Sequence, residues 1–303
     1  MRWIVRSDDG RTVRDVLARA GADARAVADG RVFVGPRRVR GDAEAVHAGD
    51  VVTVAPVLEE AGAPARIVLR AGDLVAVDKP AGIPTIPDHA GASHALVATV
   101  ARALGVEASR LHATSRLDRD VSGVVFFALT KEAGAWLARA RAEGTYERRY
   151  VAIAAAAPTP ERGAWTAPVG RARDPRLRAV GGRDAVASTT LYALVAQSPA
   201  AHAMLAVAPV TGRTHQIRVH AAHAGVPLLG DRAYGGPTRM TLPSGRVLEP
   251  RRVALHCARV VVPSESGEPL VAESGQPPEL AALWSALGGD PAAWEGATSC
   301  VLP

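Results

Sequence analysis

Lysine is almost absent from this chain of 303 residues. Only Lys79 and Lys131 occur, although Lys and Arg together number 36 against 30 Asp and Glu. Guanidinium groups therefore carry nearly all of the net charge of +6, and such groups present several donors in one plane, which suits polyanions. A GC-rich genome that encodes Arg in place of Lys explains the same bias. Charge alone therefore identifies no partner.

Cysteine and long apolar runs are also scarce. Cys257 and Cys300 are the only cysteines, and their spacing fits neither a disulfide framework nor a zinc ribbon. Residues 1–6 reach a charge before an apolar run develops, and no stretch approaches the roughly 20 uncharged apolar residues that span a bilayer. We therefore expect a cytoplasmic protein that does not associate with membranes.

Aromatic residues make up only 4% of the chain, which argues against extensive stacking along a single-stranded nucleic acid. The hydrophobic fraction of 48% is high enough to bury a large core. The sequence is therefore that of a globular protein with one large domain, with or without a smaller appendage.

The first 56 residues predict a small α/β module. Helical apolar spacing occurs at Arg11–Ala20, and short alternating stretches at Gly30–Val34 and Ala48–Val54 predict strands. Residues 57–65 are rich in Glu, Gly, Pro and Ala and predict a linker. A large domain at 66–288 and a C-terminal tail at 289–303, which carries too little pattern to assign, complete the predicted organisation.

Strands outnumber helices in the large domain. The pattern predicts an α+β fold with a mixed, largely antiparallel sheet and flanking helices. Residues 155–167 and 171–184 are expected to be surface excursions, the second strongly basic. The expected helices are Ser93–Leu104, with Ser93 as N-cap, and Lys131–Glu143; the expected strands are Leu74–Lys79, Gly123–Ala128, Arg149–Ala154, Ser188–Val195, Ala203–Val207 and Arg252–Val262.

The densest polar signature is Thr211-Gly-Arg-Thr-His-Gln-Ile-Arg-Val-His220, which is followed by Gly230-Asp-Arg-Ala-Tyr-Gly235. Two arginines, two histidines and a glutamine alternate with apolar residues within ten positions. Neither a core strand nor a solvated surface explains such a density of polar groups, so this segment is a candidate functional site.

A second candidate is the loop that enters the strand at 123–128. Asp118 and Asp120 stand two residues apart there, and either carboxylate could be catalytic. The alternative is an ordinary turn in which an Asp side chain caps local amides. Tyr150 lies between the two polar segments at the start of a predicted strand, where a tyrosine is most often a half-buried core residue.

These segments, in this order, resemble the RluA-type pseudouridine synthases over roughly residues 66–288. The family pattern His-Arg-Leu-Asp-x-x-Thr-Ser-Gly matches Ser115–Gly123, and Arg149–Ala152 resembles the family element Lys-x-Tyr-x-Ala. The resemblance implies a catalytic Asp118, a base-stacking Tyr150 and an Arg218 that pairs with Asp118 and keeps it ionised. It further implies that Arg116 fills the space left by a flipped base, that Leu255 lines the base pocket, and that Arg213, His215 and Gln216 contact the RNA or support its loop.

Two positions within the matched motif depart from the family. Ser115 replaces the usual His, and Val121 replaces the usual Thr. Residues 1–56 resemble an S4 RNA-binding domain, but the segment between Leu17 and Gly30 is too short for the usual second helix, and Gly35-Pro36 replaces the expected Asn-Gly. The S4-like module is therefore expected to be degenerate.

The resemblance implies an isomerase of specific uridines in structured ribosomal or transfer RNA, acting as a monomer without cofactor or metal. Although His215, His220 and His223 invite a metal site, no Cys or carboxylate lies at ligand spacing beside them, and we expect them to bond backbone carbonyls. Ser115, Val121 and the short S4-like module leave an alternative, which is a non-catalytic RNA-binding or RNA-chaperone protein with the same basic cleft.

Overall fold

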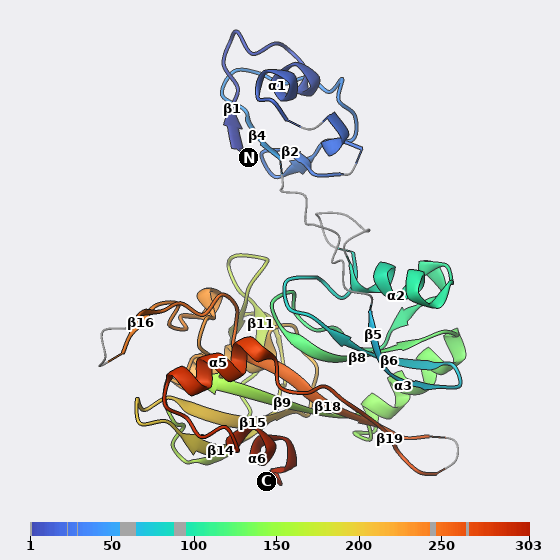
Figure 1. The fold of residues 1–303 in the computed structure, drawn as a ribbon. Helices are drawn as coiled ribbons and strands as arrows, with labels where there is room; N and C mark the ends of the chain where they lie inside the picture. The colour runs from blue at the N-terminus through green and yellow to red at the C-terminus, as the bar shows by residue number, and fades with distance from the viewer. Residues whose placement is uncertain are drawn as a thin grey trace. The chain divides into compact units, whose positions relative to one another are not determined.

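A computed structural model describes residues 2–22, 24–28, 30–54, 65–87, 95–242, 247–264 and 267–303 (Figure 1). Residues 57–64 of the predicted linker and the predicted N-cap Ser93 lie outside these ranges. The chain divides into two compact units, Met1–Pro64 with Ile86–Ala108 and Ala65–Thr85 with Ser109–Pro303. Among the described residues, no helix is both long enough and apolar enough to cross a membrane.

The first unit contains a small antiparallel sheet in the order β1-β4-β2-β3. Helix α1 begins with a capping box, in which Thr12 accepts a bond from the Asp15 amide and Asp15 accepts one from the Thr12 amide. Among the described residues between α1 and β2, the helical structure is a short 3-10 turn, where the sequence had left no room for a second helix. The elements are β1 (Arg2–Ile4), α1 (Val13–Arg19), η1 (Ala24–Ala26), β2 (Val32–Val34), β3 (Arg37–Arg38), β4 (Val51–Val54) and α2 (Leu96–Leu104).

The second unit is built on a mixed sheet, which confirms the predicted fold class. Its main path is β10-β14-β15-β9-β18-β8-β6-β5, with β19 added to β18 and β7 to β8. Pairing is antiparallel except between β18 and β8. The strands are β5 (Arg66–Ala71), β6 (Leu74–Lys79), β7 (His112–Ala113), β8 (Ser122–Ala128), β9 (Glu147–Ala154), β10 (Arg162–Trp165), β14 (Thr190–Gln197), β15 (Ala203–Pro209), β18 (Leu255–Val262) and β19 (Leu270–Glu273).

The parallel contact between β8 and β18 depends on Gly123. Its backbone has φ of 115°, which favours glycine, and a Cβ atom there would stand 2.1 Å from the Cys257 carbonyl oxygen. Any other residue would therefore push apart β8, which follows Asp118, and β18, which begins at Leu255.

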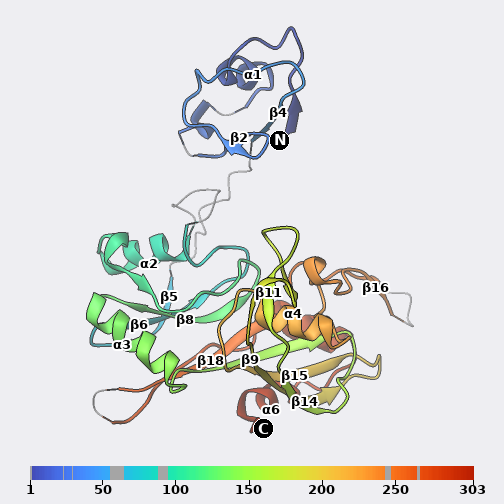
Figure 2. The ribbon, with the colours of Figure 1, turned by 180° about the vertical axis from the view of Figure 1, so that it is seen from behind.

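Helices cover the sheet on both faces. Trp284 and Trp294, from α5 and α6, share one apolar core with Val151 and Ile153 of β9, and Figure 1 shows both helices on that face. Helix α4 contacts β14 and β15 and lies on the opposite face, as the reverse view of Figure 2 shows. The helices are α3 (Lys131–Ala142), α4 (Gln216–His223), α5 (Pro278–Ala286) and α6 (Ala293–Ser299), with 3-10 turns η2 (Ala108–Arg110) and η3 (Arg232–Tyr234).

The expected surface excursions carry strands of their own. Strand β10 extends the main sheet, and a separate sheet in the order β12-β11-β13 occupies the basic segment. One of its arginines, Arg176, is paired with Asp174, and Arg178 donates hydrogen bonds to the carbonyls of Pro175 and Leu177. The remaining strands are β11 (Val169–Arg171), β12 (Arg178–Val180), β13 (Arg183–Val186), β16 (Met240–Thr241) and β17 (Val247–Leu248).

Candidate active site

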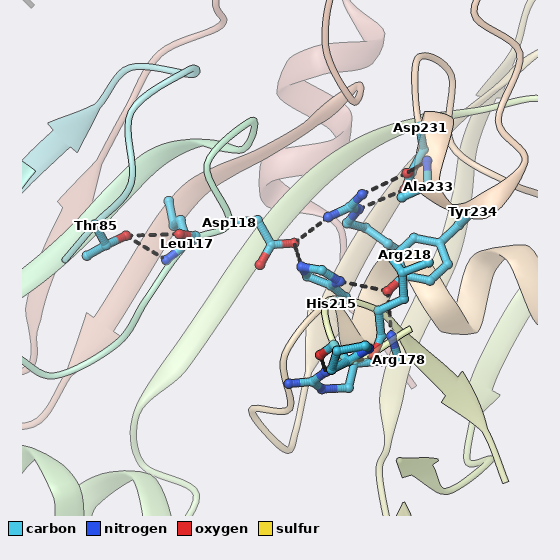
Figure 3. Close-up of polar contacts among 11 residues, drawn as sticks. Thr85, Leu117, Asp118, Arg178, His215, Arg218, Asp231, Ala233 and Tyr234 are labelled. Carbon is cyan, nitrogen blue, oxygen red and sulfur yellow. Dashed lines mark hydrogen bonds and ion pairs between the residues drawn. The ribbon is translucent and has the colours of Figure 1, made fainter. Parts of the chain in front are cut away.

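Asp118 lies in the loop between β7 and β8 (Figure 3). The neighbouring Leu117 is held from both sides by one hydroxyl, since Thr85 Oγ1 donates to the Leu117 carbonyl at 2.9 Å and accepts from its amide at 3.1 Å. The Val121 amide donates to the Asp118 carbonyl at 3.1 Å. The backbone on either side of Asp118 is therefore fixed.

Lys79 also holds this loop. Its ammonium is fully buried and donates to the carbonyls of Pro80, Ile83 and Arg119 at 2.9, 2.7 and 3.0 Å. Burial lowers the pKa of Lys79 to about 7, against the opposing effect of Asp118. Three carbonyls match the three N–H donors of the charged form. The Pro/Gly turn after β6 is thus tied to the loop that carries Asp118.

Arg218 of α4 lies between two carboxylates. Its Nη1 donates to Asp118 Oδ2 at 2.9 Å, while Nε and Nη2 donate to the two oxygens of Asp231, each at 2.8 Å. The Asp231 side chain is 1% exposed and that of Asp118 is 22% exposed. Burial alone would lower the pKa of Arg218, but the bonds and charges of Asp231 and Asp118 outweigh it and raise that pKa. The two bonds to Asp231 fix the guanidinium in one orientation. The remaining nitrogen, Nη1, is thereby directed at the more exposed carboxylate, Asp118.

His215 approaches the same carboxylate from the start of α4. Its Nε2 lies 3.8 Å from Asp118 Oδ2, and its Nδ1 lies 2.6 Å from the Tyr234 hydroxyl. That hydroxyl accepts a bond from the Arg178 amide at 3.0 Å, so we assign its hydrogen to the bond with Nδ1 and the ring hydrogen to Nε2. Burial lowers the pKa of His215, which favours the neutral ring.

The backbone of His215 is held in an unusual conformation. Its φ of 57° and ψ of 15° are left-handed, which few residues other than Gly, Asn and Asp adopt. Such strain persists only where the surroundings fix it, and it gathers at functional sites. The turn aims the ring at Asp118 and Tyr234 rather than into the helix that follows.

Sequence analysis missed Asp231 and Tyr234 as members of the site, although both stand in the Gly230–Gly235 segment. Asp231 caps η3 by accepting the Ala233 amide, and the Tyr234 ring centroid lies 4.9 Å from Arg218 Cζ. A Cβ atom on Gly230 would stand 2.0 Å from the Arg252 carbonyl oxygen, so this close turn requires glycine. The spacing Asp-x-x-Tyr after a tight glycine was the signal that could have found them.

Gln216 and His220 form an internal network. The Gln216 amide nitrogen donates to the Thr189 carbonyl and to Thr190 Oγ1, and its oxygen accepts from Thr211 Oγ1 and the Arg213 amide. These four bonds use both N–H donors and both acceptor lone pairs of the amide.

The chain of bonds continues through His220. Thr190 Oγ1 lies 2.9 Å from its Nδ1, and its Nε2 lies 2.8 Å from the Ala167 carbonyl oxygen. Of the three histidines expected to bond carbonyls, His220 does so, His215 bonds a tyrosine hydroxyl and His223 is exposed. No group of three or more His, Cys, Asp or Glu in the described ranges is placed to hold a metal ion.

Tyr150 and Leu255 lie on adjacent strands. Tyr150 of β9 faces Cys257 of β18 and is 6% exposed, and Leu255 begins β18 and is 3% exposed. Burial raises the pKa of Tyr150, so its hydroxyl remains protonated. No hydrogen bond or ion pair among the described residues joins Tyr150 to Asp118. The structure thus brings Arg218 and His215 directly onto Asp118, whereas Tyr150 and Leu255 line a neighbouring stretch of the sheet.

Arg116 and Arg213 are both exposed, and neither guanidinium forms a hydrogen bond or ion pair with another described residue. Of the two departures from the family pattern, Ser115 Oγ lies 3.2 Å from the Tyr146 hydroxyl, and Val121 is buried with 2% exposure. Ser115 therefore still joins a polar contact, while Val121 packs as an apolar residue.

Comparison with known proteins agrees with this arrangement. A model of the RNA pseudouridylate synthase family matches residues 73–223. The RNA pseudouridine synthase YhcT of Bacillus subtilis, described as uncharacterized, is 32% identical over 218 residues, which cover 71% of this chain and 69% of that protein.

Ribosomal large subunit pseudouridine synthase D of Xanthomonas campestris is 34% identical over 268 residues, which cover 82% of this chain and 79% of that protein. The solved structure of human RNA pseudouridylate synthase domain containing 4 has the same fold, with a TM-score of 0.60 and 22% identity over 73% of this chain and 92% of the human one. The chain therefore belongs to the RluA-type RNA pseudouridine synthases.

Proposed function

We propose that Asp118 is the catalytic residue of this RNA pseudouridine synthase. The reaction breaks the bond between N1 and C1′ of a uridine, turns the uracil and joins C1′ to C5, while C5 loses a proton and N1 gains one. No atom or electron is gained overall, so the reaction needs no cofactor. The uracil must first leave its stack, which costs a few kcal/mol.

The contact between Asp118 and Arg218 is the observation that carries this proposal. Asp120, the other carboxylate of the loop, is exposed and its side chain has no hydrogen bond or ion pair within the described residues. Attack on C1′, addition to C6 of the uracil and removal of the C2′ proton are three routes open to Asp118, and each starts from an ionised carboxylate. Arg218 supplies the positive charge that favours this form.

Tyr150, Leu255 and Arg116 have supporting roles in this proposal. The Tyr150 ring stacks on the extruded uracil, and Leu255 packs against it from the adjacent strand. Arg116 is exposed two residues before Asp118, which suits a side chain that enters the RNA where the base has left. The raised pKa of Tyr150 makes its hydroxyl a donor rather than a phenolate base.

Gln216 and His215 were expected either to contact the RNA or to support its loop, and we assign both to positioning. The Gln216 amide is committed to four internal bonds and is 3% exposed, so we assign it to positioning the 211–213 loop. His215 positions the Asp118 carboxylate. Arg213, whose side chain is exposed, keeps its assignment as an RNA contact.

We further propose large-subunit ribosomal RNA as the substrate, since relatives that are 31–35% identical are named ribosomal large subunit pseudouridine synthase D. The enzyme is proposed to act in the cytoplasm as a monomer without a metal ion. We also propose that residues 1–56 are an S4-like module and residues 66–288 the catalytic domain.

The test pairs Asp118→Asn with Asp120→Asn as a matched control in the same loop. Each protein is incubated with a transcript of large-subunit ribosomal RNA and, separately, with unmodified transfer RNA, and pseudouridines are mapped. We expect product with the wild type and Asp120→Asn on the ribosomal transcript and none with Asp118→Asn.

Product on transfer RNA alone would overturn the assigned substrate. A failure of the wild type on both RNAs, together with unchanged complementation of a deletion strain by Asp118→Asn, would favour the non-catalytic RNA-binding alternative.

A further inference from the structure

A second group of arginines lies close to the catalytic loop, and we name Arg116, Arg141 and Arg148 the unpaired arginine cluster. Arg141 is in the last turn of α3, Arg148 is on β9, and Arg116 lies two residues before Asp118. Within the part of the chain that the structure describes, no ion pair involves any of the three. They thus differ from Arg218, which contacts two carboxylates.

Arg148 is the buried member of the unpaired arginine cluster. It is 9% exposed, and its Nη2 donates to the carbonyls of Pro209 and Thr211 at 2.9 and 3.0 Å. Its Nε is buried and meets no acceptor among the described residues. A buried charged donor without an acceptor is costly, so a negative charge that approaches the Arg148 guanidinium is stabilising.

Arg141 meets Arg148 at one point of the backbone. A Cβ atom on Gly212 would stand 3.3 Å from Arg148 Nη1 and 3.8 Å from Arg141 Cζ, so both guanidiniums reach the same glycine. Arg141 Nε is also buried without a described acceptor. Burial lowers the pKa of Arg141, and the charges of Arg148 and Arg116 lower it further.

An aromatic ring fixes the Arg141 guanidinium. Its Cζ lies 5.4 Å from the Tyr146 ring centroid, and the Tyr146 hydroxyl lies 3.2 Å from Ser115 Oγ. A guanidinium over a ring keeps its donors free for another acceptor. Ser115, which departs from the family pattern, thus supports Arg141 through Tyr146.

The cluster lies beside the residues assigned to the flipped uridine. Arg148 precedes Tyr150 by two positions, and side chains two apart on a strand point to the same face. Like charges gathered with unfilled donors repel one another unless an anion joins them. The anion in this enzyme's substrate is the phosphodiester group, which accepts planar guanidinium donors well.

We propose that Arg141 and Arg148, with Arg116 beside them, bind a backbone phosphate of the RNA next to the target uridine. This inference rests on the proposed function, because it assigns a further part of the same substrate. An acidic surface of a protein partner would satisfy the same donors, and the experiment separates the two.

The variants are Arg141→Gln and Arg139→Gln, which remove the same charge two residues apart on α3. Arg139 is exposed, and its guanidinium has no described partner. Binding of a fluorescent twelve-residue oligouridylate is measured over a range of salt concentrations. We expect Arg141→Gln to reduce the slope of log affinity against log salt by about 0.7, the contribution of one phosphate in a single strand, and Arg139→Gln to leave the slope near that of the wild type.

Pseudouridine formation on the ribosomal transcript provides the second readout. Arg141→Gln should raise KM about tenfold with kcat close to that of the wild type, and Arg141→Lys, which keeps the charge, should recover most of the salt slope. Thermal melting of each variant checks that α3 remains folded. Arg148 is not substituted, because its Nη2 donates to the carbonyls of Pro209 and Thr211 and its loss would disturb that backbone segment.

Equal slopes for Arg141→Gln and the wild type would overturn the phosphate site and leave a protein partner as the ligand. Equal losses in Arg141→Gln and Arg139→Gln would overturn it as well, since the effect would then be one of general surface charge. Oligouridylate binding requires no catalysis, so this arm decides the phosphate site even where the wild type forms no pseudouridine.

Discussion

Arg218 and the unpaired arginine cluster use the same side chain in opposite ways. Arg218 contacts Asp118 and Asp231, and all three of its outer donor nitrogens are engaged. Arg141 and Arg148 each keep a buried Nε without an acceptor in the described part of the chain. The first guanidinium has its donors satisfied by the protein and holds the Asp118 carboxylate in place. In our proposal, the second group gains its negative charge from a ligand.

The largest effect is expected when Arg218 loses one of its two carboxylate partners, which tests whether the protein itself must satisfy this guanidinium. Asp231→Asn leaves a buried guanidinium with a single charged partner, a loss that typically costs about 3–5 kcal/mol in buried pairs. We expect the free energy of unfolding in urea to fall by that order. We also expect single-turnover pseudouridine formation to slow about a hundredfold, because Arg218 no longer has a fixed orientation.

Asp174→Asn is the matched control for Asp231→Asn. Asp174 also pairs with an arginine, Arg176, but the guanidinium there is 86% exposed, so neither stability nor rate should change appreciably. An Asp231→Asn protein with the stability and rate of the wild type would mean that Asp118 alone holds Arg218.

A buried histidine differs from the buried arginines in its response to acid. Arginine stays charged as the pH falls, whereas a buried histidine gains a proton, and the stability of the fold changes with it. His256 of β18 lies 2.8 Å from Ser122 Oγ through Nδ1 and 3.3 Å from the Ser274 carbonyl through Nε2. Burial lowers its pKa from 6.5 to about 4. Between these values the unfolded chain binds a proton that the folded chain does not, so stability falls as pH drops from about 6.5 to about 4.

The expected loss from His256 over that window is about 3 kcal/mol, at 1.36 kcal/mol for each pKa unit. Urea unfolding at pH 7 and pH 4 measures it, and His256→Gln, which can keep both hydrogen bonds, should lose less stability than the wild type between the two. Equal acid losses in both proteins would assign the sensitivity to other groups.

The smallest expected effect concerns the contact between Tyr234 and His215. Tyr234→Phe removes the hydroxyl that lies between His215 Nδ1 and the Arg178 amide but keeps the ring beside Arg218. We expect kcat to fall about threefold to tenfold with KM unchanged, since the imidazole beside Asp118 loses a fixed orientation at a cost of about 1 kcal/mol.

Tyr192→Phe removes a comparable hydroxyl, which donates to the Pro160 carbonyl, and should leave kcat unchanged. A Tyr234→Phe enzyme in which KM rises and kcat stays constant would assign Tyr234 to substrate binding instead.

The sheet could be predicted from the sequence, but helix α4 could not. Residues 74–79, 123–128 and 203–207 are apolar runs of strand length, and all of them are strands. In Gln216–Ala221 polar and apolar residues alternate as in a strand, yet the segment is helical and buried throughout. A helix that buries Gln216 and Arg218 by bonding them internally has no amphipathic period to detect.

Helix α6 was missed for a related reason. Ala293 to Ser299 holds only three large or apolar positions, and the helix is stabilised by burying Trp294 and Ala297 against the sheet rather than by its own pattern. No tail pattern predicts such a contact. Strands β9, β14 and β15, which α6 contacts, lie more than eighty residues earlier in the chain.

The site shows the same division. The resemblance paired Asp118 with Arg218 across a hundred residues, and the structure has that contact. The second carboxylate, Asp231, was not predicted as a site residue, because its spacing from Arg218 has no helical or strand period. The unpaired arginine cluster was equally hidden, since Arg116, Arg141 and Arg148 meet only through the fold.

Thr85 has a consequence beyond the bonds that it makes. Between two residues of an antiparallel ladder, each side gives and receives one hydrogen bond. A single hydroxyl oxygen makes the same exchange with Leu117, so Thr85 acts as a one-atom substitute for a peptide group. Leu117, the residue before Asp118, therefore has a pair of hydrogen bonds like that of a strand residue, although a side-chain hydroxyl rather than a neighbouring strand provides them. Arg116 and Arg119 are left exposed on either side, and the loop that carries Asp118 gains the rigidity of a sheet.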